Sequence, residues 1–177
     1  DFKQGCEKSK QPCVELKKSG ESIGTGFVLD GSPGHIAIFD AINAGQGKYQ
    51  SYTGIQSAPH PYSTAAAIAQ AAHDTLSSLF PSQRAAFDQQ LTEDLLGIKA
   101  EPPKAIGIEL GKQIAVAVLA SRVSDGSEVP EPHIGVDYFP SNLPGHWRQD
   151  PISQIPTALG AHWGACKPFV IKSTKQF

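Results

Sequence analysis

The sequence contains no methionine among its 177 residues, and its charges nearly cancel. Lysine and arginine together number 15 against 17 aspartate and glutamate residues, for a formal net charge of -2. The chain has no cluster of basic residues, so it lacks the positively charged patch of a protein that binds nucleic acid or an anionic membrane. No apolar run approaches the roughly 20 residues that a membrane-spanning helix needs. We therefore expect no nucleic-acid partner and no membrane span.

Cysteine is also scarce, with three in the chain. Cys6 and Cys13 flank a short polar segment and could close a local disulfide, whereas Cys166 is left as a buried thiol or as half of a bridge to another chain. The absence of CxxC and CxxCH argues against redox, zinc and c-type haem sites.

Because the chain starts at Asp1 and lacks methionine, we expect cleavage to have made this N-terminus; signal-peptide removal, trimming and internal proteolysis all fit. Signal-peptide removal and a local disulfide would suit an exported protein, periplasmic or extracellular.

Common catalytic motifs are missing as well. Gly24 and Gly26 lack the third glycine of a dinucleotide-binding loop, and GxxxxGK[ST] does not occur. The segment 24–30 resembles the strand that opens trypsin-like domains, but the chain has neither GxSxG nor GDSGG. The acidic residues of the segment 88–94 are predicted to lie on a solvated helix face. From the residues alone the conclusion is an all-α domain without an assigned function.

The six histidines are scattered along the chain. His73 precedes Asp74 in an alanine-rich segment and is predicted to be a core or helix-face residue with a local hydrogen bond. His35 is expected to be structural. Three others lie in the segment rich in proline and tryptophan: His133, His146 and His162. They could form a metal site, but their spacings match no compact ligand template. We therefore assign no metal ligand.

The residues that are present predict one all-α domain preceded by an arm. Residues 1–34 are poor in apolar side chains and are predicted to be irregular, with a short strand within 24–30 and a turn at 31–34. Residues 127–168 are predicted to form a long ordered loop, because proline and tryptophan at this density suit packing over a surface. Between these flanks the apolar spacing predicts four helices, over 35–45, 63–79, 82–97 and 103–122. Ser63 and Ser82 are the expected N-cap residues of the second and third helices.

The fourth predicted helix has apolar residues on several sides, which is typical of a central helix. One stripe is formed by Ile106, Leu110, Ile114 and Val118, and other apolar residues cover a second side. Small residues also recur every four positions, which predicts a close helix–helix contact along a ridge: Gly107, Gly111 and Ala115.

Five segments in chain order resemble the bacterial vanadium-dependent haloperoxidases. Residues 38–44 resemble the FDAxN helix of that family. Residues 65–73 with Leu79-Phe80-Pro81 are similar to its alanine-rich helix and L[FY]P ending. The third segment is similar to the family's GxxxG…VA…RxxDG helix, through Gly107 to Gly111, Val116-Ala117 and Arg122-x-x-Asp125-Gly126. The fourth, Pro144-Gly145-His146-Trp147, is similar to its PGxW turn. The fifth is similar to its W…PF…QF ending, through Trp163, Pro168-Phe169 and Gln176-Phe177. The resemblance covers residues 35–177, whereas the arm before it departs from the family's Arg- and Ala-rich first helix.

The resemblance implies a helical bundle related to acid phosphatases that share the same oxyanion pocket. Family members hold vanadate with Lys, two Arg, a Ser-Gly pair and a His, while a second His bonds to vanadium. Hydrogen peroxide binds the metal, and the activated oxygen oxidises a halide. Cationic donors suit this oxyanion because their hydrogen bonds are charge-assisted, and they draw electron density from the peroxide much as a Lewis acid does.

The motifs of that pocket are absent from this sequence. It has no Arg-Pro and no Ser-Gly-His, and its only arginines are Arg84, Arg122 and Arg148. No catalytic, cofactor-binding or metal residue is therefore assigned. The match runs to Phe177, just before the family's pocket motifs would begin, so we expect the chain to be the N-terminal, scaffold half of such an enzyme. Vanadate would then bind only in the assembly, completed by a C-terminal segment or a partner chain.

This hypothesis predicts a large interface, and two alternatives to it stay open. A half-bundle should expose apolar faces of the helix at 103–122, so we expect an interface well above roughly 2,000 Å² with the other half. The alternatives are a phosphatase-like or inactive relative, in which the same scaffold binds phosphate, and a non-catalytic helical interaction subunit.

Overall fold

A computed structural model describes residues 26–55, 61–173 and 175–176 of the chain. Within these ranges the structure consists of helices and loops, and its β-pairing is limited to two isolated bridges. The predicted all-α class is confirmed. The helices, in chain order, are α2 (Gly26–Gln46), α3 (Thr64–Leu79), the 3₁₀ turn η1 (Pro81–Gln83), α4 (Arg84–Leu96), α5 (Pro103–Ser121) and the 3₁₀ turn η2 (Trp163–Ala165).

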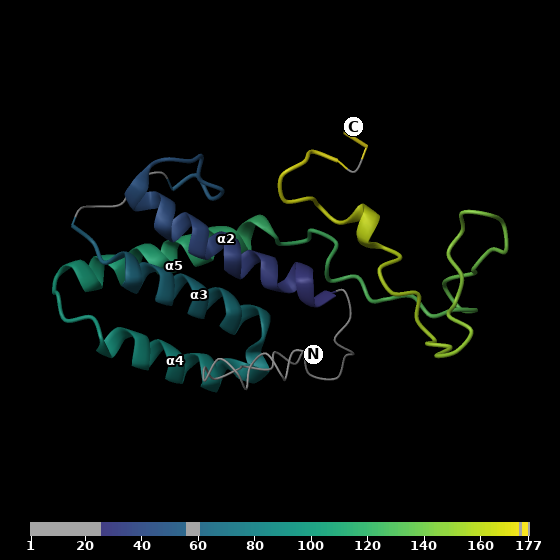
Figure 1. Cartoon of the computed structure of the whole chain (residues 1–177), viewed down its shortest axis with the longest axis horizontal. Helices are drawn as coiled ribbons and strands as arrows, with labels where there is room; N and C mark the ends of the chain where they lie inside the picture. The colour runs from purple at the N-terminus through teal and green to yellow at the C-terminus, as the bar shows by residue number, and fades with distance from the viewer. Residues whose placement is uncertain (1–25, 56–60, 174, 177) are drawn as a thin grey trace.

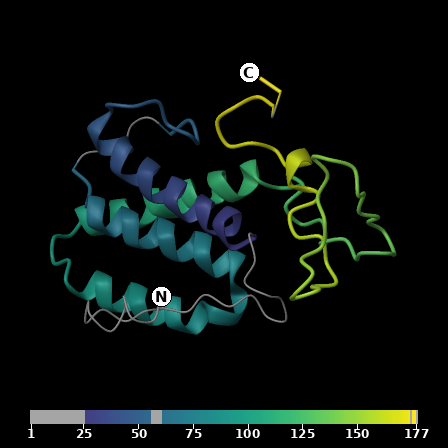
Figure 2. The ribbon, with the colours of Figure 1, turned by 45° about the vertical axis from the view of Figure 1, so that its right-hand side comes forward.

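The four α-helices form one body, from which the irregular segment that follows α5 extends to one side (Figures 1 and 2). Helix α3 contacts α2, α4 and α5, whereas α5 contacts α2 and α3. The central helix is therefore α3, and the prediction that the helix at 103–122 takes this place is wrong. Most of the residues that α3 buries are small, which lets three neighbours approach it: Ala66, Ala67, Gln70, Ala71, Thr75 and Ser77. None of the helices in the described ranges has the length and hydropathy needed to cross a membrane.

Helix α2 begins earlier than its sequence suggests. The strand and turn expected before His35 are wrong over the part that the structure describes, because residues 26–34 are helical with Pro33 inside the helix. Pro33 and Gly34 are both buried, and a Cβ atom on Gly34 would lie 3.4 Å from Leu76 Cδ2 on α3. Packing against α3 thus outweighs the local turn signal of Pro-Gly. Residues 1–25 of the predicted arm lie outside the described residues.

The core lies where α2, α3 and α5 meet. It consists of alanines from α2 and α3 together with larger side chains from α5: Ala37, Ala41, Ala44, Ala67, Ala71, Leu110, Ile114 and Val118. Three of the four residues in the predicted stripe of α5 are thus buried within the chain, and Ile106 is half-buried. The expectation that this face is exposed is wrong. On another side of α5, Val116 is 68% exposed.

The ridge of small residues on α5 packs against α3, as the sequence predicts. A Cβ atom added to Gly111 would lie 2.6 Å from the carbonyl oxygen of Ala67, and one added to Gly107 would overlap the carbonyl oxygen of Ser63. Only glycine therefore allows the two backbones to come this close. The amide of Ser63 also donates to the carbonyl oxygen of Pro103 at 2.8 Å, which joins the starts of the two helices.

The ends of α3 and α4 test the capping predictions. Ser63 is the N-cap of α3, and its hydroxyl accepts a hydrogen bond from the amide of Ala66 at 3.2 Å, as predicted. Helix α4 ends at Gly97 as expected, but its N-cap is Gln83 and not Ser82, which belongs to the preceding 3₁₀ turn. Phe87 is the residue that α4 buries. This helix packs on α3 at the edge of the bundle.

Candidate functional site

A buried carboxylate organises the loop that follows α2. Asp40 is fully buried, and its two oxygens accept hydrogen bonds from both backbone and side chain across the loop. The amides of Tyr52 and Thr53 donate at 2.9 and 2.7 Å, and the hydroxyls of Ser51 and Thr53 donate at 3.1 and 2.7 Å. A buried carboxylate with this many donors is satisfied, so Asp40 has a structural role.

Asn43, one helical turn after Asp40, fixes the start of the same loop. Its side-chain amide donates to the carbonyl oxygen of Tyr49 at 2.7 Å, and its Oδ1 accepts from the amide of Tyr49 at 2.9 Å. The ring of Tyr49 also contacts that of Phe39, with centroids 6.1 Å apart. The polar residues of the FDAxN-like segment therefore hold residues 49–53 against α2.

The second polar cluster lies at the end of α5. Arg122 forms an ion pair with Asp125, its Nη2 donates to the carbonyl oxygen of Lys167 at 2.8 Å, and its guanidinium carbon lies 4.0 Å from the ring centre of Phe169. The backbone amide of Lys167 donates to the carbonyl oxygen of Asp125 at 2.7 Å, and its Nζ donates to that of Ser121 at 3.1 Å. The RxxDG-like segment thus anchors the C-terminal segment to the bundle.

The carboxyl of Asp125 is held in its charged form. Burial alone would raise its pKa, but hydrogen bonds from Ser127, together with the charge of Arg122 and its hydrogen bond, outweigh this effect and leave the pKa below its usual range. The ion pair is therefore formed at neutral pH. It is a clamp between α5 and the C-terminal segment.

Gly126 completes this clamp. Its φ of +92° lies in the region that favours glycine, and a Cβ atom there would lie 3.4 Å from the Cα of Cys166. Cys166 is a buried free thiol, as one of the two sequence alternatives held. Burial raises the pKa of this thiol, and the charge of Asp125 raises it further. The predicted bridge between Cys6 and Cys13 lies outside the described residues.

The two polar clusters are joined by an aromatic contact. The ring of Tyr52, whose amide is bound to Asp40, lies with its centroid 6.5 Å from that of Phe169, which stacks on Arg122. Burial raises the pKa of the Tyr52 hydroxyl, and the charge of Arg122 lowers it in part. Tyr52 and Phe169 therefore connect the loop held by Asp40 to the clamp at Arg122.

A cleft of about 300 Å³ opens beside the clamp. Its walls come from the ends of α3 and α5, from α2, and from the C-terminal segment. They are mostly apolar and include Pro33, Leu79, Leu119, Val123 and Phe169, with Arg122 and Asp125 as the charged residues. Of the features described, this cleft is the best candidate for a ligand-binding site.

His73 joins α3 to α4. Its Nδ1 lies 2.7 Å from Asp74 Oδ1 and its Nε2 lies 2.7 Å from Asp88 Oδ1, while the imidazole is 10% exposed. The local hydrogen bond predicted for this histidine is confirmed. Asp88 is exposed, as predicted, and it also accepts a hydrogen bond from His73 on the neighbouring helix. His35 lies within α2.

The three histidines of the irregular segment do not form a metal site. In the part of the chain that the structure describes, no group of three or more His, Cys, Asp or Glu side chains is arranged to hold an ion. His133 is instead in a local turn, where its amide donates to Asp137 and its carbonyl oxygen accepts from Tyr138.

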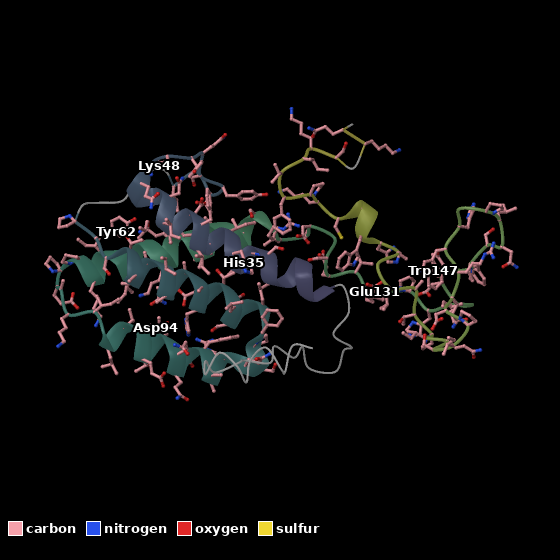
Figure 3. All side chains as sticks on the ribbon, in the orientation of Figure 1. His35, Lys48, Tyr62, Asp94, Glu131 and Trp147 are labelled. Carbon is pink, nitrogen blue, oxygen red and sulfur yellow. The ribbon has the colours of Figure 1, made fainter. Side chains whose placement is uncertain are left out.

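The segment 127–168 is irregular and internally bonded, as predicted. The expectation that it packs over a surface is wrong, because it extends to one side of the helical body and exposes Val136, Phe139 and Ile152 (Figure 1). Its two arms are joined by the bridge between His133 and Thr157 and by a hydrogen bond from the amide of Gly160 to Glu131 Oε2 at 2.8 Å. Trp147, in the PGxW-like turn, packs edge-on against Tyr138 at 5.5 Å. Figure 3 places Trp147 and Glu131 away from Tyr62 and the other labelled residues of the helical body.

Comparisons with protein-family models, with curated protein sequences and with solved structures found no match. The function of this chain therefore has to be inferred from its own residues and from the haloperoxidase-like motifs of its sequence.

The first polar cluster leaves a signal in the sequence. Asp40 and Asn43 lie on the same helix face as Ala37, Ala41 and Ala44, where a polar side chain needs a hydrogen-bonding partner. The partners themselves lie on loops, whose course no periodicity reveals.

Proposed function

We propose that this chain is the scaffold half of a vanadium-dependent haloperoxidase-type enzyme, which oxidises halide with hydrogen peroxide. One observation carries the proposal: residues from four of the five resembling segments make long-range contacts, the PGxW-like turn being the exception. Asp40 holds the loop after α2, Gly111 allows the contact of α5 with α3, and Arg122 holds the C-terminal segment through Lys167 and Phe169.

This coincidence supports the resemblance for a physical reason. A chance match to a short motif would fall on residues of any kind, most of them exposed. Here Asp40 and Asp125 are buried and fully partnered, and Gly107 and Gly111 lie where a side chain does not fit. Such positions constrain a sequence strongly, because an unpartnered buried charge or an overlapping side chain costs several kcal/mol.

The three arginines of this chain, all within the described residues, do not fit the vanadate pocket itself. That pocket needs several cationic donors converging on one oxyanion. Arg84 is mostly exposed and lies 4.0 Å from Asp88, Arg122 is paired with Asp125, and Arg148 donates to the carbonyl oxygen of Asn142 in the irregular segment. We therefore propose that a C-terminal segment or a partner chain supplies the pocket, and that peroxide and halide are substrates of the assembly alone.

An interaction subunit without catalysis is the second candidate. The irregular segment exposes several large apolar side chains, among them Val136, Phe139 and Ile152, which are 74%, 75% and 92% exposed. Exposed apolar groups of this kind are typical of surfaces that bind another protein. A phosphatase-like or inactive relative is the third candidate, because the same oxyanion pocket accepts phosphate.

The test begins with the chain isolated from its source under native conditions. Intact mass measurement should show the 18.8 kDa chain covalently continuous with, or accompanied in equal amount by, the polypeptide that holds the pocket. With vanadate, hydrogen peroxide and bromide, this material should brominate phenol red, and omission of vanadate should abolish the reaction. Hydrolysis of a phosphate ester without bromination would favour the phosphatase. A single 18.8 kDa species, inactive in both assays, would contradict the proposal and favour the interaction subunit.

A further inference from the structure

The cleft beside the clamp is large enough to hold a small molecule. Its volume of about 300 Å³ lies at the lower end of the range that ligand pockets occupy. It is built by elements far apart in the sequence, because α2 contributes Pro33, α3 contributes Leu79, α5 contributes Leu119 and the C-terminal segment contributes Phe169. Its shape therefore depends on the completed fold.

The walls favour an apolar, aromatic ligand. Aliphatic side chains of Leu79, Leu119 and Val123 line the cleft together with the ring of Phe169. The Phe169 ring is fixed in place by Arg122 and by Tyr52. A fixed ring among aliphatic groups offers a flat aromatic molecule both burial and ring contact.

Arg122 supplies the polar contact. Its Nη2 is occupied by Asp125 and by the carbonyl oxygen of Lys167. Among the described residues none accepts a hydrogen bond from its Nε or Nη1, so these donors remain for a ligand or for water. A ligand with a hydrogen-bond acceptor can therefore bind the guanidinium while its ring lies against the apolar walls.

The charges around the cleft favour a neutral ligand. Among the residues that line the cleft, Asp125 balances the charge of Arg122, so the walls themselves carry no net charge. The C-terminal end of α3 at Leu79 lies at the cleft and carries partial negative charge, whereas the end of α5 is bound by the ammonium group of Lys167 at Ser121. We propose that the cleft binds a small neutral aromatic molecule through one acceptor, such as a carbonyl oxygen, on Arg122. This proposal does not depend on the haloperoxidase-type function.

Three naphthalene dyes test the ligand class on the full chain by fluorescence titration. Prodan is neutral and carries a ketone, N-phenyl-1-naphthylamine is neutral without a carbonyl, and 1-anilinonaphthalene-8-sulfonate is an anion. We expect saturable one-to-one binding of Prodan, tighter than that of either other dye. Tighter binding of the sulfonate, or no saturable binding of Prodan, would overturn the proposal.

Variants locate the binding. Ala120 is exposed and lines the cleft, so Ala120→Trp should fill it and weaken Prodan binding at least about tenfold. Ala105→Trp is the matched control, since Ala105 is equally exposed on α5 but does not line the cleft. Ser78→Phe is a second cleft-filling variant on α3. Prodan binding that is unchanged in both cleft variants, each folded by circular dichroism, would overturn the proposal.

Arg122→Met tests the polar contact. The variant removes the donors and also releases Phe169, so both neutral dyes should bind more weakly. Prodan should lose roughly tenfold more affinity than N-phenyl-1-naphthylamine, the equivalent of one hydrogen bond, because only Prodan carries the carbonyl. Equal loss of both dyes would show that Arg122 acts only on the shape of the cleft and would contradict its role as the ligand's donor.

Discussion

The guanidinium carbon of Arg122, at the C-terminal end of α5, lies 4.0 Å from the ring centre of Phe169 in the C-terminal segment. The same guanidinium is paired with Asp125 and bound to the carbonyl oxygen of Lys167. One side chain therefore joins the helical body to the segment that follows the long loop. The stability of this clamp, and the shape of the cleft beside it, should depend on the charge of Asp125.

Asp125→Asn should weaken the clamp in a pH-dependent way. We expect a loss of about 2 kcal/mol in the free energy of unfolding at pH 7, the size of a charge-assisted hydrogen bond. The folded-state pKa of Asp125 is lowered, so its contribution is complete above the usual unfolded value of about 4 and is lost as the pH falls through the folded pKa. In urea unfolding, the difference between wild type and variant should therefore shrink below about pH 4. A difference that stays constant from pH 7 to pH 3 would contradict this account.

Asp40→Asn should destabilise the fold more than the loss of an exposed carboxylate. The fully buried carboxylate accepts four hydrogen bonds from residues 51–53. In the variant, the NH2 group of the asparagine would face some of these N–H and O–H donors and could not accept from them. We expect a loss of about 3 kcal/mol in urea unfolding. Asp94→Asn is the matched control, because Asp94 lies exposed on α4, and it should change the stability by less than about 0.5 kcal/mol. Equal effects of the two substitutions would show that the loop is not held by Asp40.

Gly111→Ala should separate α3 and α5. The added Cβ atom would lie 2.6 Å from the carbonyl oxygen of Ala67, so the backbones must move apart. We expect a loss of about 2 kcal/mol despite the higher helix propensity of alanine, measured as a fall in Tm. Gly97→Ala is the control, since its Cβ atom would make an ordinary 3.7 Å contact at a negative φ. If Gly111→Ala is as stable as Gly97→Ala, the close contact is not required.

The reactivity of Cys166 should report on the clamp. Its thiol is buried and its pKa is raised by burial and then by Asp125, so little thiolate is available to react at pH 7. We expect slow alkylation by iodoacetamide in the folded chain and fast alkylation in urea, followed by mass spectrometry of the peptide that contains Cys166. Arg122→Met removes a charge that lowers the pKa of the thiol, but it also loosens the clamp that buries the thiol, so the folded reaction should become faster. Asp94→Asn should leave it unchanged. Fast labelling of the wild type would show that the thiol is exposed.

The parts of the fold that could be predicted are those that local hydrophobic periodicity and helix-capping residues determine. Ser63 and Leu79 bound α3 as expected, and the spacing of Gly107 and Gly111 indicated the close contact on α5. These features involve neighbours within a few residues, so the sequence displays them directly.

The parts that could not be predicted depend on distant packing. Pro33-Gly34 is a turn signal locally, yet it lies inside α2 because the helix is packed against Leu76 of α3. The hydrogen bond between His73 and Asp88 joins two helices, and no spacing in the sequence indicates their relative rotation. The cleft is likewise invisible in the sequence, because four separate elements form its walls.

Vanadium content tests the proposed function most directly. The chain alone and the native assembly that contains it are each incubated with orthovanadate, passed through a desalting column and analysed for vanadium by mass spectrometry. We expect one vanadium per copy of the chain in the assembly and none above background with the chain alone, because its arginines do not converge on one site. Vanadium retained in stoichiometric amount by the chain alone, or absent from the assembly, would contradict the proposed function.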